Sequence, residues 1–245
     1  MDAWLNLGGP DNGLNAAKVG WQPQGIVATG VGANGSDIKF ADLNGDGRAD
    51  YLWVHADGSV DAWLNLAGTS DGPNVIRVVW VSQGKIASGL GKNGSEVQFA
   101  DLNGDGRAEY LWVHPDGSVD AWLNRGSSST GPYAGTVSWQ PLGTIATGIR
   151  KSSTGQEFGD INGDARDDYL WVDPSNGAVT AYLNFGGPGN RPENAQIHYS
   201  ADGVVATGVG TDGSGVRFAD LNGDGRVEYL NVNANGAVDA WLNGC

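Results

Sequence analysis

Cysteine, long apolar runs and basic residues are all scarce in this chain of 245 residues. The single cysteine, Cys245, is the last residue, so no disulfide can form within the chain. No apolar run approaches the roughly 18 residues that would span a bilayer. Lys and Arg number 14 against 28 Asp and Glu, so no basic surface is available to meet phosphates. We therefore expect neither a membrane nor a nucleic acid as a partner.

What the chain does contain is a set of four near-identical acidic loops of the form Asp-x-Asn-Gly-Asp-x-Arg-x-Asp/Glu. They span residues 42–50, 101–109, 160–168 and 220–228 and recur about every 60 residues. Hard cations such as Ca²⁺ take about six to eight oxygen ligands, which side chains at positions 1, 3, 5 and 9 and the carbonyl of position 7 can supply. The predicted metal ligands are Asp42, Asn44, Asp46, Arg48, Asp50, Asp101, Asn103, Asp105, Arg107, Glu109, Asp160, Asn162, Asp164, Arg166, Asp168, Asp220, Asn222, Asp224, Arg226 and Glu228.

These loops predict about four structural Ca²⁺ ions per chain, with each arginine giving its carbonyl and pointing its guanidinium outward. The alternative is a set of hairpins rich in Asx turns that bind no metal. A catalytic metal would be expected once, whereas every repeat carries a loop, so the ions would stabilise the fold. Repeat three has Ala165 where the others have Gly, at a position that often needs positive φ, and its site should be weaker.

The acidic loops also indicate where the protein is found. Free Ca²⁺ is abundant outside cells, so we expect a secreted, extracellular protein, although the chain opens inside a repeat and shows no signal peptide.

Each loop is followed by the same short alternating segments, and no segment has a helical period. In the first repeat, residues 51–55 and 60–65 flank a Gly-centred turn, and a later Trp-containing segment and a Phe-containing segment complete the set. Aliphatic side chains take one face of each segment and aromatic ones the other, which is typical of sheets covered on both sides. We predict an all-β fold, a β-propeller of four-stranded antiparallel blades. It would form one array over residues 1–245, with units of about 7–65, 66–124, 125–184 and 185–243 and an extra strand at 2–6.

The string Asp-x-Asn-Gly-Asp-Gly-Arg-x-Asp-Tyr-Leu at residues 42–52 resembles the FG-GAP/VCBS repeat family, and the resemblance covers essentially the whole chain. In that family, which includes integrin α-subunit heads, the repeats form propeller blades with a Ca²⁺ loop in a hairpin. The chain looks most like fungal Psathyrella-type lectins, which bind GlcNAc in pockets between neighbouring blades. The resemblance implies glycans, possibly of GlcNAc type, as partners. The same repeats also occur as accessory domains of secreted hydrolases and lyases.

The repeat count departs from that family, whose propellers have about seven blades. The chain has four loops but five copies of an Asp-Ala-Trp-Leu-Asn strand, at residues 2–6, 61–65, 120–124, 180–184 (where it reads Thr-Ala-Tyr-Leu-Asn) and 239–243. We interpret the chain as an array cut from a longer protein or as one that closes with another copy. Open blade edges would expose aromatic faces, so a homo-oligomer that completes the propeller is expected.

Candidate ligand-binding residues lie near the Gly-centred turns, where aromatic plates and polar groups that can bond sugar hydroxyls come together. They are His55, Asp61, Trp63, His114, Asp120, Trp122 and Asp173. The alternative is that these side chains only complete solvent-exposed hairpin ends. The variable linkers at 8–20, 67–79 and 185–196 are a second place for specificity.

Three functions are compatible with these patterns. We favour a calcium-stabilised lectin with repeated weak pockets and predict no enzyme, because no nucleophile elbow, zinc motif or phosphate loop is present. The others are a non-catalytic accessory domain of a larger secreted enzyme and an enzyme with a site in a central channel.

Overall fold

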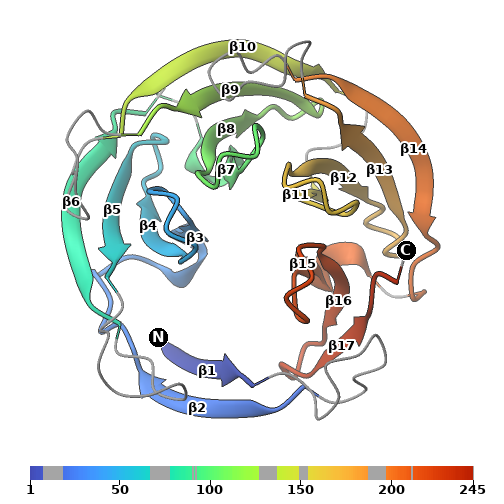
Figure 1. Ribbon diagram of the computed structural model, residues 1–245, viewed down its shortest axis with the longest axis horizontal. Helices are drawn as coiled ribbons and strands as arrows, with labels where there is room; N and C mark the ends of the chain where they lie inside the picture. The colour runs from blue at the N-terminus through green and yellow to red at the C-terminus, as the bar shows by residue number, and fades with distance from the viewer. Residues whose placement is uncertain are drawn as a thin grey trace. The chain divides into compact units, whose positions relative to one another are not determined.

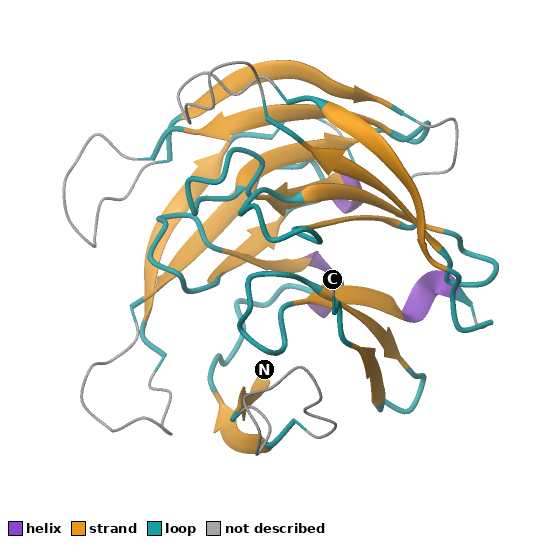
Figure 2. Ribbon diagram, turned by 45° about the vertical axis from the view of Figure 1, so that its right-hand side comes forward, coloured by secondary structure: helices purple, strands orange, loops and turns teal. Residues whose placement is uncertain are grey.

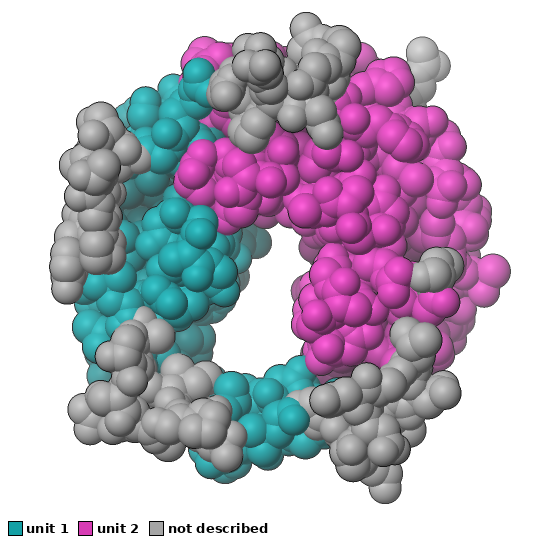
Figure 3. Space-filling view, viewed as in Figure 1, with its two compact units in different colours: residues 1–97, 124–139 teal, residues 98–123, 140–245 magenta. Residues whose placement is uncertain are grey.

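A computed structural model describes residues 1–7, 19–66, 78–89, 91, 93–126, 137–148, 154–186, 197–210 and 212–244. The chain forms two compact units, coloured separately in Figure 3. Unit 1 contains Met1–Val97 and Asn124–Trp139, and unit 2 contains Gln98–Leu123 and Gln140–Cys245. The single array over residues 1–245 stays a prediction. No described helix is long and apolar enough to cross a membrane.

Strands make up almost all of the regular structure, as Figure 2 shows. Within the described ranges the only helical elements are short 3₁₀ turns. These are η1 (Gly35–Asp37), η2 (Gly94–Glu96) and η4 (Gly213–Gly215).

Unit 1 contains a two-stranded sheet and a four-stranded sheet, labelled in Figure 1. The first pairs β1 (Asp2–Asn6) with β2 (Trp21–Ile26). The second has the order β3-β4-β5-β6, with each strand paired to the next in sequence. Its strands are β3 (Ile38–Ala41), β4 (Asp50–Val54), β5 (Val60–Asn65) and β6 (Trp80–Ala87).

The remaining three sheets lie wholly or mostly in unit 2. The first is made of β7 (Val97–Ala100), β8 (Glu109–Val113), β9 (Ser118–Asn124) and β10 (Trp139–Thr147). The next is made of β11 (Gln156–Gly159), β12 (Asp168–Val172), β13 (Val179–Asn184) and β14 (Tyr199–Ala206). The last has three described strands, β15 (Val216–Ala219), β16 (Glu228–Val232) and β17 (Val238–Trp241). The predicted all-β propeller fold with four-stranded antiparallel blades is confirmed.

The register of each blade separates its two faces as the alternation predicts. In β4, Leu52 and Val54 are buried together with Ala62 of β5 on the aliphatic face. On the other face Tyr51 meets Trp63 edge-on, with ring centroids 5.6 Å apart. Edge-to-face contacts of this kind add to the free energy gained by burial.

Within unit 2, consecutive blades pack the aliphatic face of one against the aromatic face of the next. Leu111 and Val119 of the β7–β10 blade lie in one buried cluster with Tyr169 and Trp171 of β12. Because each blade has one face of each kind, the same packing can repeat from blade to blade.

Asparagine side chains at the ends of strands also donate to the acidic loop of the preceding repeat. The buried Asn184, at the end of β13, donates from Nδ2 to the carbonyl of Leu102 over 2.8 Å. The corresponding Asn124 donates to the carbonyl of Leu43 over 3.0 Å. These bonds fix the loop of one repeat against the strand of the next.

Candidate functional site

The acidic loops share one conformation, which begins with the aspartate at position 1. In repeat one, Asp42 Oδ1 accepts from the amide of Gly45 over 2.7 Å and Oδ2 accepts from that of Gly47 over 2.7 Å. Asp101, Asp160 and Asp220 accept from the equivalent amides. A carboxylate that gathers backbone amides in this way holds the turn closed around itself.

The arginine at position 7 is not oriented as the sequence predicts. Its guanidinium does not point outward but forms an ion pair with the aspartate at position 5. The distance is 2.6 Å for Arg48–Asp46, 2.5 Å for Arg107–Asp105 and 2.7 Å for Arg166–Asp164. The backbone turn places the two side chains side by side, and opposite charges at that distance attract each other.

The carboxylate at position 9 is fully buried in all four loops. In repeat one, Asp50 accepts from the amide of Leu43 over 2.9 Å and from that of Asn65 over 2.8 Å, so both oxygens are used by the backbone. Asp168 makes the equivalent two bonds in repeat three. Burial raises the pKa of each aspartate to about 6 despite these bonds.

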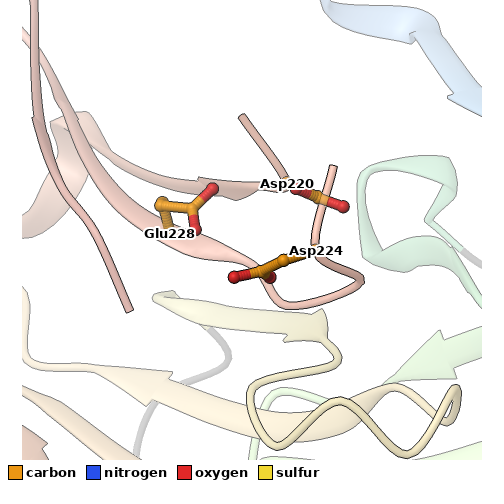
Figure 4. Close-up of side chains that lie close together, drawn as sticks. All are labelled: Asp220, Asp224 and Glu228. Carbon is orange, nitrogen blue, oxygen red and sulfur yellow. The ribbon is translucent and has the colours of Figure 1, made fainter. Parts of the chain in front are cut away.

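Position 9 is the longer glutamate in repeats two and four, Glu109 and Glu228, and in repeat four it completes a cluster of carboxylates. Oε2 of Glu228 accepts from the amide of Leu221 over 2.5 Å, while the buried Oε1 has no hydrogen-bond partner within the described residues. Asp220, Asp224 and Glu228 each bring an oxygen within 4.8 Å of the others. Figure 4 shows the three side chains close together. A buried carboxylate oxygen without a donor is costly unless a cation compensates it. Among the described residues, this acidic cluster is the one group whose geometry fits a metal ion.

The backbone at Ala165 confirms the reason for expecting a weaker site in repeat three. Ala165 has φ 67°, and it is the one described residue other than glycine with positive φ. The equivalent Gly47 has φ 79°, so the loop imposes this conformation whatever residue occupies the position. A side chain there costs about 1–2 kcal/mol because Cβ crowds the following carbonyl.

Replacing Ala165 with glycine should therefore stabilise the protein. We expect Ala165→Gly to raise the melting temperature by about 2–5 °C, since about 1 kcal/mol corresponds to 2–4 °C in a chain of this size. Thermal unfolding followed by circular dichroism measures the shift. Gly47→Ala is the matched control, because a Cβ there has open space around it. That variant should lose stability by a similar amount, and equal melting temperatures for all three proteins would contradict the backbone explanation.

Two of the predicted ligand residues in each of the first two repeats come together near the Gly-centred turn. His55 Nε2 lies 2.6 Å from Asp61 Oδ2, and the Trp53 ring lies over the imidazole with centroids 4.1 Å apart. In repeat two, His114 and Asp120 are 2.9 Å apart, and the Trp112 ring lies tilted against His114 with centroids 3.8 Å apart. The histidine and aspartate side chains are about one-quarter exposed. We call each set of three residues a His-Asp-Trp cluster.

The tryptophans predicted from the sequence, Trp63 and Trp122, are not those of the clusters. Trp63 and Trp122 pack edge-on against Tyr51 and Tyr110, one cross-strand pair away from the histidines. Trp53 was not predicted, although it lies in β4 two residues before His55, so that both side chains lie on one face.

Repeats three and four lack the cluster. Asp173 accepts from Ser175 and lies beside no histidine of its own strand, while Asn233 donates to Asp239 over 2.9 Å. The variable linkers at 8–20, 67–79 and 185–196 lie almost entirely outside the described residues, so their role stays a prediction.

A cavity of about 320 Å³ lies in unit 2 between β10 and the β11–β14 blade. Tyr169, Tyr182, Tyr199 and the exposed His198 line it, together with Ile145. Tyrosine rings and an imidazole at one cavity form a second surface where a polar ligand with apolar faces could bind.

Comparison with known proteins identifies the family of the repeat. The family model described as FG-GAP-like repeat matches residues 42–112, 101–171 and 160–230. A search of curated proteins found no match. Among solved structures, an Agrocybe aegerita lectin that recognises non-reducing terminal N-acetylglucosamine is similar at 20% identity and a TM-score of 0.49. The match covers 91% of this chain and 58% of that lectin, so the chain spans a little over half of its length.

Proposed function

This chain belongs to the FG-GAP-like repeat family, and on that premise we propose that it is a calcium-stabilised β-propeller that binds carbohydrate and catalyses no reaction. The observation that carries the proposal is the His-Asp-Trp cluster, which recurs in repeats one and two with the same contacts. Repetition of one polar and aromatic constellation is what a multivalent binding protein needs, whereas an active site would be expected once.

The chemistry of the cluster suits a sugar. A partly exposed carboxylate accepts hydrogen bonds from hydroxyl groups, and the imidazole can donate or accept depending on its tautomer. The indole beside them offers an apolar plate for the C–H face of a pyranose ring. Side chains already held by hydrogen bonds lose little freedom on binding: Asp120 also accepts from Thr144 over 2.6 Å. Each cluster has only three side chains and is partly exposed, so each would bind weakly and the repeats would add avidity.

The calcium part of the proposal is that all four loops bind a structural ion, about four per chain. The acidic cluster of repeat four supports it through the Glu228 oxygen that has no hydrogen-bond partner among the described residues. The other loops share its sequence pattern and position 1 geometry. A bound ion would supply positive charge against the gathered carboxylates, and the side chains at positions 1, 3, 5 and 9 would hold it. Loops of this kind also favour a secreted protein, because calcium is abundant outside cells.

Sugar binding is tested by removing both imidazoles. We expect His55→Ala with His114→Ala to weaken binding of N-acetylglucosamine about tenfold or more, since a hydrogen bond to a charged group is worth about 1.5–3 kcal/mol. Isothermal titration calorimetry measures the affinity, and a glycan array identifies the sugar if N-acetylglucosamine itself is a poor ligand.

His198→Ala is the matched control, because it removes the same side chain from the 320 Å³ cavity instead. The double variant should keep its calcium content and melting temperature. If only His198→Ala loses binding, the site lies in that cavity and the clusters are hairpin ends. If the wild-type chain binds no glycan at all, the lectin proposal is wrong and an accessory or interaction domain replaces it.

A further inference from the structure

The three-stranded blade β15–β17 of unit 2 leaves a large cavity against β14. Its volume is about 510 Å³, and it is lined by Val205 and Ala206 of β14, Tyr229 of β16 and Trp241 of β17. The 320 Å³ cavity is its counterpart one blade earlier, since Ile145, Tyr169 and Tyr182 occupy the equivalent repeat positions. The difference between the two lies in the strand that follows each blade.

In the four-stranded blades, the first aromatic residue of the outer strand fills this place. Trp80 of β6 meets Tyr51 with centroids 5.6 Å apart, and Tyr199 of β14 meets Tyr169 at 6.0 Å. Tyr229 is equivalent to Tyr51 and Tyr169, but among the described residues no outer strand brings an aromatic ring beside it. The larger cavity is therefore shaped for the first residue of an outer strand.

The outer-strand tryptophan also makes a specific hydrogen bond to the preceding blade. Trp80 Nε1 donates to the carbonyl of Val27 over 2.8 Å, and Trp139 Nε1 donates to that of Ile86 over 2.9 Å. Val205 is the equivalent residue beside the large cavity, and it is 45% exposed. A third acceptor of the same kind thus lies at the cavity.

The edge of β17 matches the strand that β2 already pairs with. Residues 2–6 and 239–243 have the identical sequence Asp-Ala-Trp-Leu-Asn. In β1 this sequence pairs with β2 in a register that sets Asn6 opposite Trp21 and Leu5 opposite Gln22. In β17 all four residues are exposed, and within the described part of the chain no strand pairs with the outer edge. Trp21 is itself 53% exposed.

We propose that β2 of a second copy of this chain pairs with β17 and inserts Trp21 into the 510 Å³ cavity. Trp21 would then pack on Tyr229 and donate from Nε1 to the carbonyl of Val205. This locates the self-association expected from the repeat count, and it does not depend on sugar binding.

A second copy is favoured over the chain's own β2 by the pairing that the structure shows. The chain's own β2 pairs with β1 over five positions and leaves Trp21 exposed. Because β1 and β17 have the same sequence, exchanging one for the other keeps the backbone pairing and gains the burial of Trp21.

Removing the Trp21 side chain tests the contact. We expect multi-angle light scattering to give the wild-type chain a mass of at least two copies, without any sugar present. Trp21→Ala should give the mass of one copy at the same concentration. Trp4→Ala is the matched control, because Trp4 is similarly exposed at 57% but lies on β1, which the exchange releases. A monomeric wild type, or equal effects of the two variants, would overturn the proposal.

Disulfide trapping locates the strands without relying on a destabilising change. In a Cys245→Ser background, one copy carries Gln22→Cys and another carries Leu242→Cys, the pair expected opposite each other. Directly opposed strand residues are close enough for a disulfide. Oxidation of the mixture should yield the mixed dimer and little of either homodimer. If a chain carrying both cysteines forms the bond within itself, the strand comes from the same chain and the proposal fails.

Discussion

Chelation of calcium should lower the melting temperature by about 5–10 °C for every loop that had bound an ion. An ion present at a hundred times its dissociation constant stabilises the folded state by about 2.7 kcal/mol per site. In a chain of about 250 residues, each kcal/mol corresponds to about 2–4 °C. If all four loops bind, the total shift between saturating calcium and excess chelator is about 20–40 °C.

The size of the effect follows from what the carboxylates cost without a cation. Burial raises the pKa of Asp50 and Asp168 to about 6 and also raises the pKa of Glu228. A carboxylate whose pKa is raised on folding is destabilising when it is ionised. A divalent ion reverses this balance, so its binding and the stability of the fold are linked.

Single-loop variants determine how many ions bind. Asp224→Ala should remove one calcium, and Asp46→Ala with Asp105→Ala should remove two, as measured by calorimetric stoichiometry and by elemental analysis. Asp116→Ala, an exposed aspartate outside the loops, is the control and should leave both numbers unchanged. A stoichiometry of one that is lost only in Asp224→Ala would restrict calcium to repeat four. Unchanged stoichiometry and melting temperature in every loop variant would exclude the metal role.

The blade design could be predicted from the sequence because its causes are local. Alternation in residues 51–55 determines which side chains share a face once the segment is a strand. The glycine of the acidic loop, present at position 47 but replaced by Ala165 in repeat three, showed where positive φ is needed. Both signals act within a few residues and recur in each repeat.

The differences among the four loops could not be read from the pattern. Position 9 is a carboxylate everywhere, yet Asp50 reaches two backbone amides, while the longer Glu228 leaves one oxygen without a partner among the described residues. Which amides the carboxylate at position 9 reaches depends on the position of the last residue of the third strand of the blade, such as Asn65 of β5. The choice of tryptophan beside His55 failed for a similar reason, since two tryptophans share that face and only the register separates them.

Loss of the Asn184 side chain should produce the second large effect on stability. Its Nδ2 donates to the carbonyls of Leu102 and Asp167, and its Oδ1 accepts from the amide of Gly186 over 3.0 Å. The side chain is fully buried, so no water replaces these bonds in Asn184→Ala. Each buried polar group left without a partner costs about 1–3 kcal/mol, so we expect a loss of about 3–5 kcal/mol. Thermal unfolding should show a decrease of about 10 °C or more.

The equivalent Asn243 makes the same hydrogen bond in a less buried place, so its variant shows how much of the lost stability depends on burial. It donates to the carbonyl of Ile161 over 2.7 Å, but its surroundings are only partly buried. Because water can reach the groups that Asn243→Ala exposes, that variant should lose less than half as much stability. Asn184→Asp keeps the acceptor for Gly186 but loses both donors and buries a charge, so it should be at least as damaging as alanine. If Asn184→Ala and Asn243→Ala lose the same stability, burial does not determine what the bond contributes. If neither variant loses stability, the bond between blades contributes little, and the packing of aliphatic on aromatic faces holds successive blades together.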